Sequence, residues 1–194
     1  RHALKVELLA HLYYSPDHLP GQQARGYRWP AVTCDGYAFD CGGPVRKDTG
    51  MSACYNGSVP QLQPGALLAV PPSIKLSDLG LVSPPAIKIF TALQDYGAYV
   101  VADSAWNSTS VAMQAGVEQE FEQVFGFKFS QTDRRCQQPQ GCAFLQDMWR
   151  IFGQLHVVDN NFITSIGGGG APRVPSAPPL NDTRLCPKKI TWEI

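Results

Sequence analysis

The sequence predicts an α+β fold, mainly an antiparallel β-sandwich or a jelly-roll-like sheet, with two or three short helices. Short strand-like segments are separated by long loops and interrupted by prolines, which is typical of antiparallel sheets. Strands and helices do not alternate regularly, which disfavours a doubly wound parallel sheet. The longest irregular stretch carries three cysteines, so we expect long loops held by disulfides, followed by an extended proline-rich tail.

The first predicted strand is residues 4–8, where apolar and polar residues alternate as in a half-buried strand. Residues 27–32 predict a second strand. Pro30 places that strand at a sheet edge or a bulge, because proline lacks the N–H that pairs in a ladder. Apolar runs predict the remaining strands at residues 66–70, 99–102 and 155–158.

The clearest predicted helix begins after Ser83, a good N-cap residue, with Pro84 in the first helical position. Apolar residues then recur every three or four positions, and Gly97 follows as the C-terminal cap. A strand comes at once, so we expect this helix to pack on a sheet face. Two more helices are predicted at 118–125 and 142–152, the latter with an apolar face of Phe144, Leu145, Met148, Trp149 and Phe152.

The chain divides by composition into two parts. Residues 1–166 predict a secreted, β-rich globular domain, and residues 167–194 a Gly/Pro-rich hinge with an extended C-terminal tail. Residues 190–194 alternate apolar and polar, so the tail could deliver a short strand to its own sheet or to a neighbouring subunit. Because the chain starts without methionine, we expect a processed piece of a longer precursor.

Charge balance argues against nucleic-acid binding, and the length of the apolar runs argues against a membrane span. Sixteen basic residues offset sixteen acidic ones, so the chain lacks the positive field that nucleic-acid binding requires. No run of about eighteen apolar residues occurs, so no membrane span is expected. Charged residues make up only 16% of the chain, against about 25% in ordinary domains, and covalent glycans would supply the missing solubility.

Three Asn-x-Ser/Thr sequons indicate N-glycosylation. They lie among turn-forming residues, where an acceptor must be, at Asn56, Asn107 and Asn181. Ser176, in the proline-rich tail, is a candidate for O-glycosylation. These sites predict a secreted or cell-surface glycoprotein.

Six cysteines, an even number, indicate disulfides. No closely spaced Cys-x₂₋₄-Cys pair occurs, so a zinc site is not predicted. Cys136 and Cys142 enclose a loop short enough to close locally, and we expect them to pair. The other four can pair in three ways; the pairing we favour joins Cys41 to Cys54 and Cys34 to Cys186.

No catalytic residue, metal site or cofactor is predicted. His11 and His18 do not have the spacing of a helical ligand pair, and the glutamates between 118 and 122 fit a solvated helix face. The Gly-x-Ser-x-Gly motif of serine hydrolases is absent from the sequence. Aromatic rings could stack on sugars, and Trp29 and Trp106 are the candidates because both are expected near the surface.

Four stretches together resemble a known family. They are residues 2–6 (HALKV), 27–31 (YRWPA), 83–97 (SPPAIKIFTALQDYG) and 101–106 (VADSAW). In order and content they are similar to a β-rich domain of large exported proteins from soil actinobacteria and some eukaryotic microbes. The likeness covers residues 2 to about 125, without the cysteine-rich stretch 34–60. The resemblance implies export and a β-rich fold, and it implies no activity.

These observations predict a non-enzymatic extracellular glycoprotein that acts as a structural or assembly subunit of a cell-surface coat, wall or fibril. Its partners would then be copies of itself or other extracellular matrix proteins. Two alternatives remain open: a carbohydrate-binding module of a secreted protein, and a secreted glycan-processing hydrolase whose carboxylates the sequence does not reveal.

Overall fold

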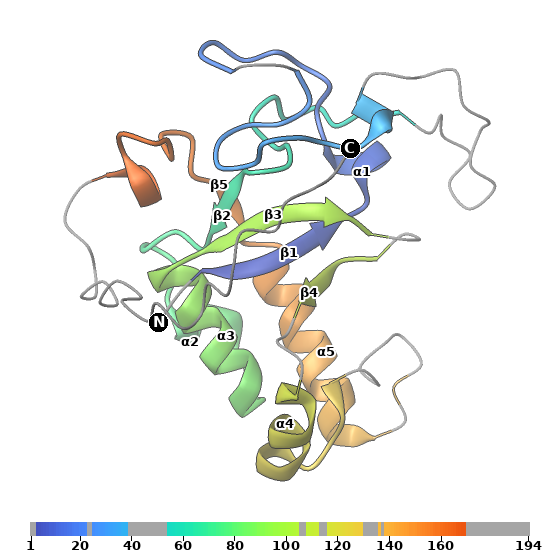
Figure 1. Ribbon diagram of the computed structural model, residues 1–194. Helices are drawn as coiled ribbons and strands as arrows, with labels where there is room; N and C mark the ends of the chain where they lie inside the picture. The colour runs from blue at the N-terminus through green and yellow to red at the C-terminus, as the bar shows by residue number, and fades with distance from the viewer. Residues whose placement is uncertain are drawn as a thin grey trace, which may run out of the picture.

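The structure is a computed structural model that describes residues 3–22, 25–38, 54–104, 108–112, 116–129, 136 and 138–169. These residues form a mixed α+β fold around one five-stranded sheet (Figure 1). The sheet order is β4-β1-β3-β2-β5. The strands are β1 (Leu4–Leu8), β2 (Leu67–Ala69), β3 (Ala98–Asp103), β4 (Ser110–Ala112) and β5 (His156–Val157).

The sheet mixes both strand directions. β1 and β3 lie parallel at its centre, with Leu4 opposite Ala98 and Val6 opposite Val100. The pairs β1–β4, β2–β3 and β2–β5 are antiparallel. The long connection from β1 to β3 contains β2 and the helix that precedes β3, which is how two parallel neighbours are joined.

Five helices accompany the sheet in the described part of the chain, with 3-10 turns at η1 (Gly36–Ala38) and η3 (Ile166–Gly168). The helices are α1 (Ala10–Tyr13), α2 (Leu76–Leu79), α3 (Pro84–Asp95), α4 (Val117–Phe125) and α5 (Pro139–Phe152). Figure 1 shows α3, α4 and α5 on one side of the sheet, while loops that follow α1 gather on the other. Among the described residues, no helix has the length and apolar character to cross a membrane.

The core lies between the sheet and the long helices. Val6 and Val100 from the central strands are almost fully buried, as is Leu93 of α3. Phe144 of α5 extends this core towards α4, where it meets Phe121 in an edge-to-face contact with ring centroids 5.9 Å apart. Burying a large apolar side chain contributes about 1.5–3 kcal/mol, so this layer is a major source of stability.

Several sequence predictions are confirmed. β1 spans the predicted residues 4–8, and α3 begins at Pro84 as expected. After α3 the chain passes through Gly97 with φ of 72°, a left-handed conformation that glycine adopts without strain. β2, β3, α4, α5 and β5 also lie where strands and helices were predicted.

Three predictions about the fold need comment. The sandwich or jelly roll is not confirmed, because the described strands form one sheet and α3 and α5 cover the face that a second sheet would occupy. Residues 27–32 are not a strand: the Trp29–Pro30 peptide is cis, and a turn joins the Ala31 N–H to the Arg28 oxygen. The described residues form more helices than the two or three predicted, because α1 and α2, with four residues each, are too short to show a helical period.

The tail from residue 170 lies outside the described residues, and the division at 166/167 stays a prediction.

Candidate ligand-binding cavity

A cavity of about 610 Å³ lies between α1, the loop 59–62, the C-terminal part of α5 and the segment that contains β5. Small-molecule sites usually enclose about 300–1,000 Å³, so the volume suits a ligand of a few rings. The apolar part of its wall comes from Leu8, Val59, Leu62, Leu68, Leu155 and Val157. This wall is continuous with the core, which gives the site a firm base.

Aromatic rings form the second part of the wall. Tyr13 of α1 and Trp149 of α5 line the cavity and keep 40% and 62% of their surface exposed. Phe152, one turn after Trp149, is half-buried beside them. Large aromatic residues are normally buried, so two exposed rings at one cavity indicate a surface for stacking.

The polar part of the wall has one acidic group. Among the described lining residues the polar side chains are Gln61, Thr109, His156 and Asp159, and neither lysine nor arginine occurs. His156 and Asp159 are both exposed, on β5 and in the turn after it. The site therefore offers hydrogen-bond donors and acceptors around an apolar, aromatic surface.

A buried arginine holds two polar walls of the cavity together. Arg28 is 8% exposed, and its guanidinium donates to the backbone oxygens of Gln61 (3.4 Å), Asp159 (2.7 Å) and Asn161 (3.3 Å). Burial lowers the pKa of Arg28, and the Asp159 carboxylate opposes that shift. The planar guanidinium suits this role because its several N–H groups diverge in fixed directions. Arg28 thus fixes the spacing between loop 59–62 and the turn after β5.

Buried hydrogen bonds also fix α1, which carries Tyr13. The hydroxyl of the neighbouring Tyr14 accepts the Leu8 N–H (3.1 Å) and donates to the Ala102 oxygen (2.6 Å). Burial raises the pKa of Tyr14, so the hydroxyl stays protonated and keeps donating. Asp103 accepts the Ala10 N–H at 2.8 Å, where α1 begins. The position of Tyr13 is therefore set by the ends of β1 and β3.

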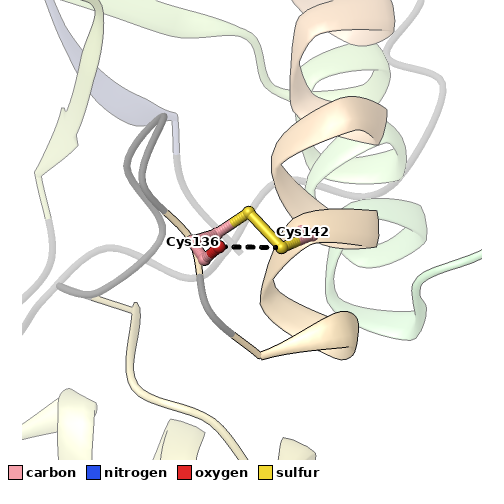
Figure 2. Close-up of a disulfide and its surroundings, with 2 residues drawn as sticks. All are labelled: Cys136 and Cys142. Atoms are coloured by element: carbon pink, nitrogen blue, oxygen red, sulfur yellow. Dashed lines mark hydrogen bonds between the residues drawn. A yellow bond between two sulfur atoms is a disulfide. The ribbon is translucent and has the colours of Figure 1, made fainter.

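A disulfide fixes the start of α5, which carries Trp149. Cys136 and Cys142 are bonded, with their Cα atoms 5.4 Å apart, as the sequence predicts (Figure 2). The bond ties the first turns of α5 to the segment before it.

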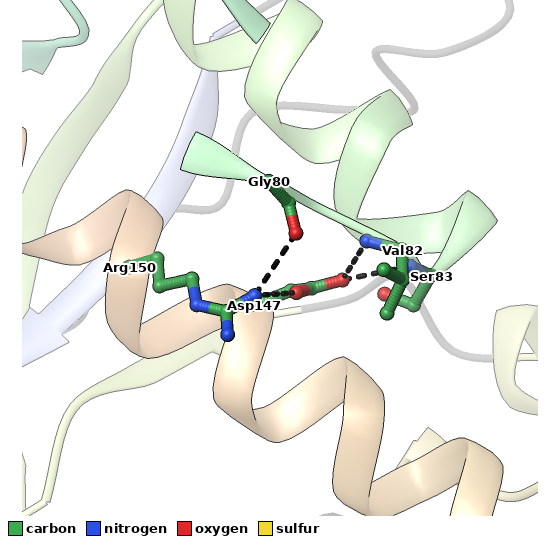
Figure 3. Close-up of polar contacts among 5 residues, drawn as sticks. All are labelled: Gly80, Val82, Ser83, Asp147 and Arg150. Atoms are coloured by element: carbon green, nitrogen blue, oxygen red, sulfur yellow. Dashed lines mark hydrogen bonds and ion pairs between the residues drawn. The ribbon is translucent and has the colours of Figure 1, made fainter. Parts of the chain in front are cut away.

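An acidic side chain fixes the middle of α5. The Asp147 carboxylate is fully buried and accepts the N–H groups of Val82 (2.9 Å) and Ser83 (2.7 Å) just before α3 (Figure 3). Arg150 pairs with the other carboxylate oxygen at 3.0 Å and donates to the Gly80 oxygen. These bonds join α5 to the loop between α2 and α3, so Trp149 stands on an anchored helix.

No family model, curated protein or solved structure matches the chain. The function is therefore argued from the cavity itself.

Neither of the two tryptophans predicted to contact sugar is among the described residues that line this cavity. Trp29 is half-buried, with its ring centroid 6.5 Å from that of Phe162, and it is not among the lining residues. Trp106 lies outside the described residues. Trp149 was expected on the buried face of its helix. Met148 is buried on that face as predicted, together with Ile151, whereas Trp149 is largely exposed.

The other predicted site residues have mixed outcomes. Asn56 is exposed, and its amide donates to the Cys54 oxygen at 3.2 Å. Cys34 forms no disulfide with a described cysteine. Within the described ranges, no group of three or more His, Cys, Asp or Glu side chains could hold a metal ion, and His11 is buried while His18 is exposed. The predictions outside the described residues concern Cys41, Asn107, Ser176, Asn181 and Cys186.

Sequence reasoning missed most of the residues that line the cavity. Gln61, Thr109 and Asp159 are in loops, and no spacing in the sequence brings them together. One signal was available: Trp149 directly follows Met148 on α5, and adjacent helical residues point about 100° apart. Both cannot face the centre of one core, so one of the two was bound to turn towards the surface.

Proposed function

We propose that this chain is a non-enzymatic extracellular glycoprotein domain that binds carbohydrate in the cavity between α1 and α5. The observation that carries the proposal is the pair of exposed rings, Tyr13 and Trp149, on a cavity whose polar groups are Gln61, Thr109, His156 and Asp159. The C–H face of a pyranose packs on an aromatic ring, while its hydroxyls hydrogen-bond to amide, carboxylate and imidazole groups. The apolar wall then excludes water from the buried side of the sugar.

The number of carboxylates on the described cavity wall favours sugar binding over glycoside hydrolysis. Glycoside hydrolysis uses a pair of carboxyl groups across the scissile bond. Asp159 is the one carboxylate among the described lining residues. A binding role needs no second carboxylate, so it fits this wall better than the hydrolase alternative.

Two features support the extracellular part of the proposal. The Cys136–Cys142 bond is of the kind that persists in oxidising compartments. Asn56, in the sequon Asn56-Gly57-Ser58, has the exposure that a glycan acceptor needs. The resemblance to exported domains of actinobacteria and eukaryotic microbes is part of this same proposal.

Replacing Trp149 with alanine is expected to weaken sugar binding about tenfold or more, because a tryptophan that becomes covered by its ligand commonly contributes over about 1.4 kcal/mol. The measurement is titration calorimetry with a sugar identified on a glycan array. Ile163→Ala is the matched control, since Ile163 has the same 62% exposure and does not line the cavity. Equal affinities of Trp149→Ala and the unchanged protein would remove Trp149 from the site.

Expression in a eukaryotic secretory pathway is expected to add an N-linked glycan at Asn56, because this side chain is exposed. The intact mass of Asn56→Gln should fall by one glycan relative to the unchanged protein. Treatment with a deglycosidase should then remove that difference. A glycosylated protein whose mass is insensitive to Asn56→Gln would exclude this acceptor.

An assembly role is a second candidate, and the exposed edge of the sheet favours it. In the part of the chain that the structure describes, β4 pairs only with β1, so its outer edge can accept another strand. The strand predicted from the sequence at 190–194 is the candidate donor. Sedimentation velocity of the full chain and of a chain lacking residues 187–194 tests this role. Identical monomeric profiles would contradict it.

A further inference from the structure

The charges around the cavity allow the ligand class to be narrowed, on the basis of the proposed carbohydrate-binding function. Asp159 supplies a negative charge to the described wall, and neither lysine nor arginine lines that wall. A uronic acid or another acidic sugar would bring a second negative charge close to it. Like charges at short range repel, and the repulsion grows as water is excluded from the site.

The nearest arginine does not offset this repulsion by binding the ligand. Arg28 is 8% exposed and directs its N–H groups to the oxygens of Gln61, Asp159 and Asn161. Its positive charge lies behind the backbone of residue 159 and acts on the Asp159 carboxylate through space. These three hydrogen bonds direct the guanidinium to the two walls, and Arg28 is not among the described residues that line the cavity, so it is not placed to pair with a carboxylate there.

Hydrogen bonds hold the backbone of Asp159 in place, which suits this residue to discriminate between neutral and acidic ligands. Arg28 lies on a turn whose backbone is itself held, since the Arg28 N–H donates to the Pro64 oxygen at 2.9 Å. The turn after β5 is also fixed by Asn161, whose side-chain oxygen accepts the Gly167 N–H and the Tyr99 hydroxyl. The backbone that carries Asp159 is thereby held at the cavity, whose wall includes Asp159.

We infer that the cavity selects uncharged sugars against acidic ones, and that Asp159 is the specificity-determining residue. In an uncharged sugar, hydroxyls donate to the Asp159 carboxylate, while one ring face packs on Trp149. In the corresponding uronic acid, a carboxylate replaces the C6 hydroxymethyl group and opposes Asp159. Arg28 acts as the positioning residue that keeps Asp159 and Gln61 on facing walls.

The test uses matched pairs of tetrasaccharides. Neutral oligomers of glucose, galactose and mannose are compared by calorimetry with the glucuronic, galacturonic and mannuronic acid oligomers, respectively. Measurements are made at one pH and one ionic strength throughout, because salt screens the repulsion between charges. We expect the best neutral ligand to bind about tenfold or more tightly than its acidic counterpart.

Asp159→Asn assigns that selectivity to one side chain. This variant keeps the shape and removes the charge, so the ratio of neutral to acidic affinity should fall to within about threefold of unity. Glu120→Gln, on the exposed side of α4 and outside the cavity wall, removes the same charge and should leave the ratio unchanged.

The outcomes separate the two proposals. An acidic oligomer that binds as tightly as its neutral partner, or a ratio that Asp159→Asn does not alter, overturns the selectivity and leaves sugar binding standing. Absence of binding to every oligomer overturns the proposed function, and the selectivity falls with it. Thermal unfolding of each variant, compared with the unchanged protein, shows whether a lost affinity comes from a lost fold.

Discussion

Replacement of Gly65 with alanine should lower the free energy of unfolding by about 3 kcal/mol or more, a loss typical of strained or overpacked backbone sites. Gly65 has a φ of 90°, and a Cβ built there would lie 1.8 Å from the Arg28 oxygen. That oxygen cannot move freely because it accepts the Ala31 N–H at 2.9 Å. Gly65 is held as well, since its own N–H donates to the Val100 oxygen at 2.8 Å.

Gly126→Ala is the matched control for this substitution. Gly126 has a φ of 79°, and an added Cβ would meet no atom within 4 Å. It therefore carries the conformational cost of a positive φ, about 1 kcal/mol, without the collision. Urea denaturation of both variants gives the two losses. Equal losses would show that the Arg28 turn shifts away from the new methyl group with little resistance.

The same variant links the fold to the cavity. A displaced Arg28 backbone would move the guanidinium that holds Gln61 and Asp159. Sugar affinity of Gly65→Ala should therefore fall even at temperatures where the variant remains folded. Retained affinity together with lowered stability would separate the Arg28 turn from the site.

Local signals explain what the sequence predicted well. α3 is predicted from the sequence because a serine suited to the N-cap, a proline and a regular apolar period occur in one continuous stretch before Gly97, although the Ser83 side chain makes no capping hydrogen bond. β1 was located because its alternation matches the two faces of a sheet. The Cys136–Cys142 bond was expected because only five residues separate the cysteines, and proximity along the chain brings them together.

The cavity could not be predicted in the same way, because tertiary contacts create it. Gln61 and Asp159 are brought together by Arg28, which is 33 and 131 residues away from these two residues, whose backbone oxygens it binds. The 27–32 segment has the composition of a strand, yet its hydrogen bonds serve the turn and the Pro64 oxygen. Trp149 shows the same limit, since the apolar period identified the helix and left open which of two neighbouring residues would face the core.

The second large effect concerns Asp147, whose replacement by alanine is expected to cost about 3 kcal/mol of unfolding free energy. The carboxylate is fully buried, and its removal leaves the N–H groups of Val82 and Ser83 without that acceptor. A buried donor without a partner costs about 1–3 kcal/mol; the Ser83 N–H is buried, and the Val82 N–H is partly buried. No pattern in the sequence indicates this role, because a lone aspartate in a helix usually faces solvent.

Comparison with Arg150→Ala separates the hydrogen bonds from the ion pair. Arg150 keeps 47% of its side chain exposed, so solvent screens its interaction with Asp147, and its loss should cost below about 1 kcal/mol. Asp147→Asn retains an oxygen that can accept one or both N–H groups. Its loss of unfolding free energy should therefore lie between those of the two alanine variants. Thermal or urea unfolding ranks all three. If Asp147→Ala were no less stable than Arg150→Ala, the loop before α3 would be free to open and hydrate its N–H groups. Asp147 would then not anchor the helix that carries Trp149.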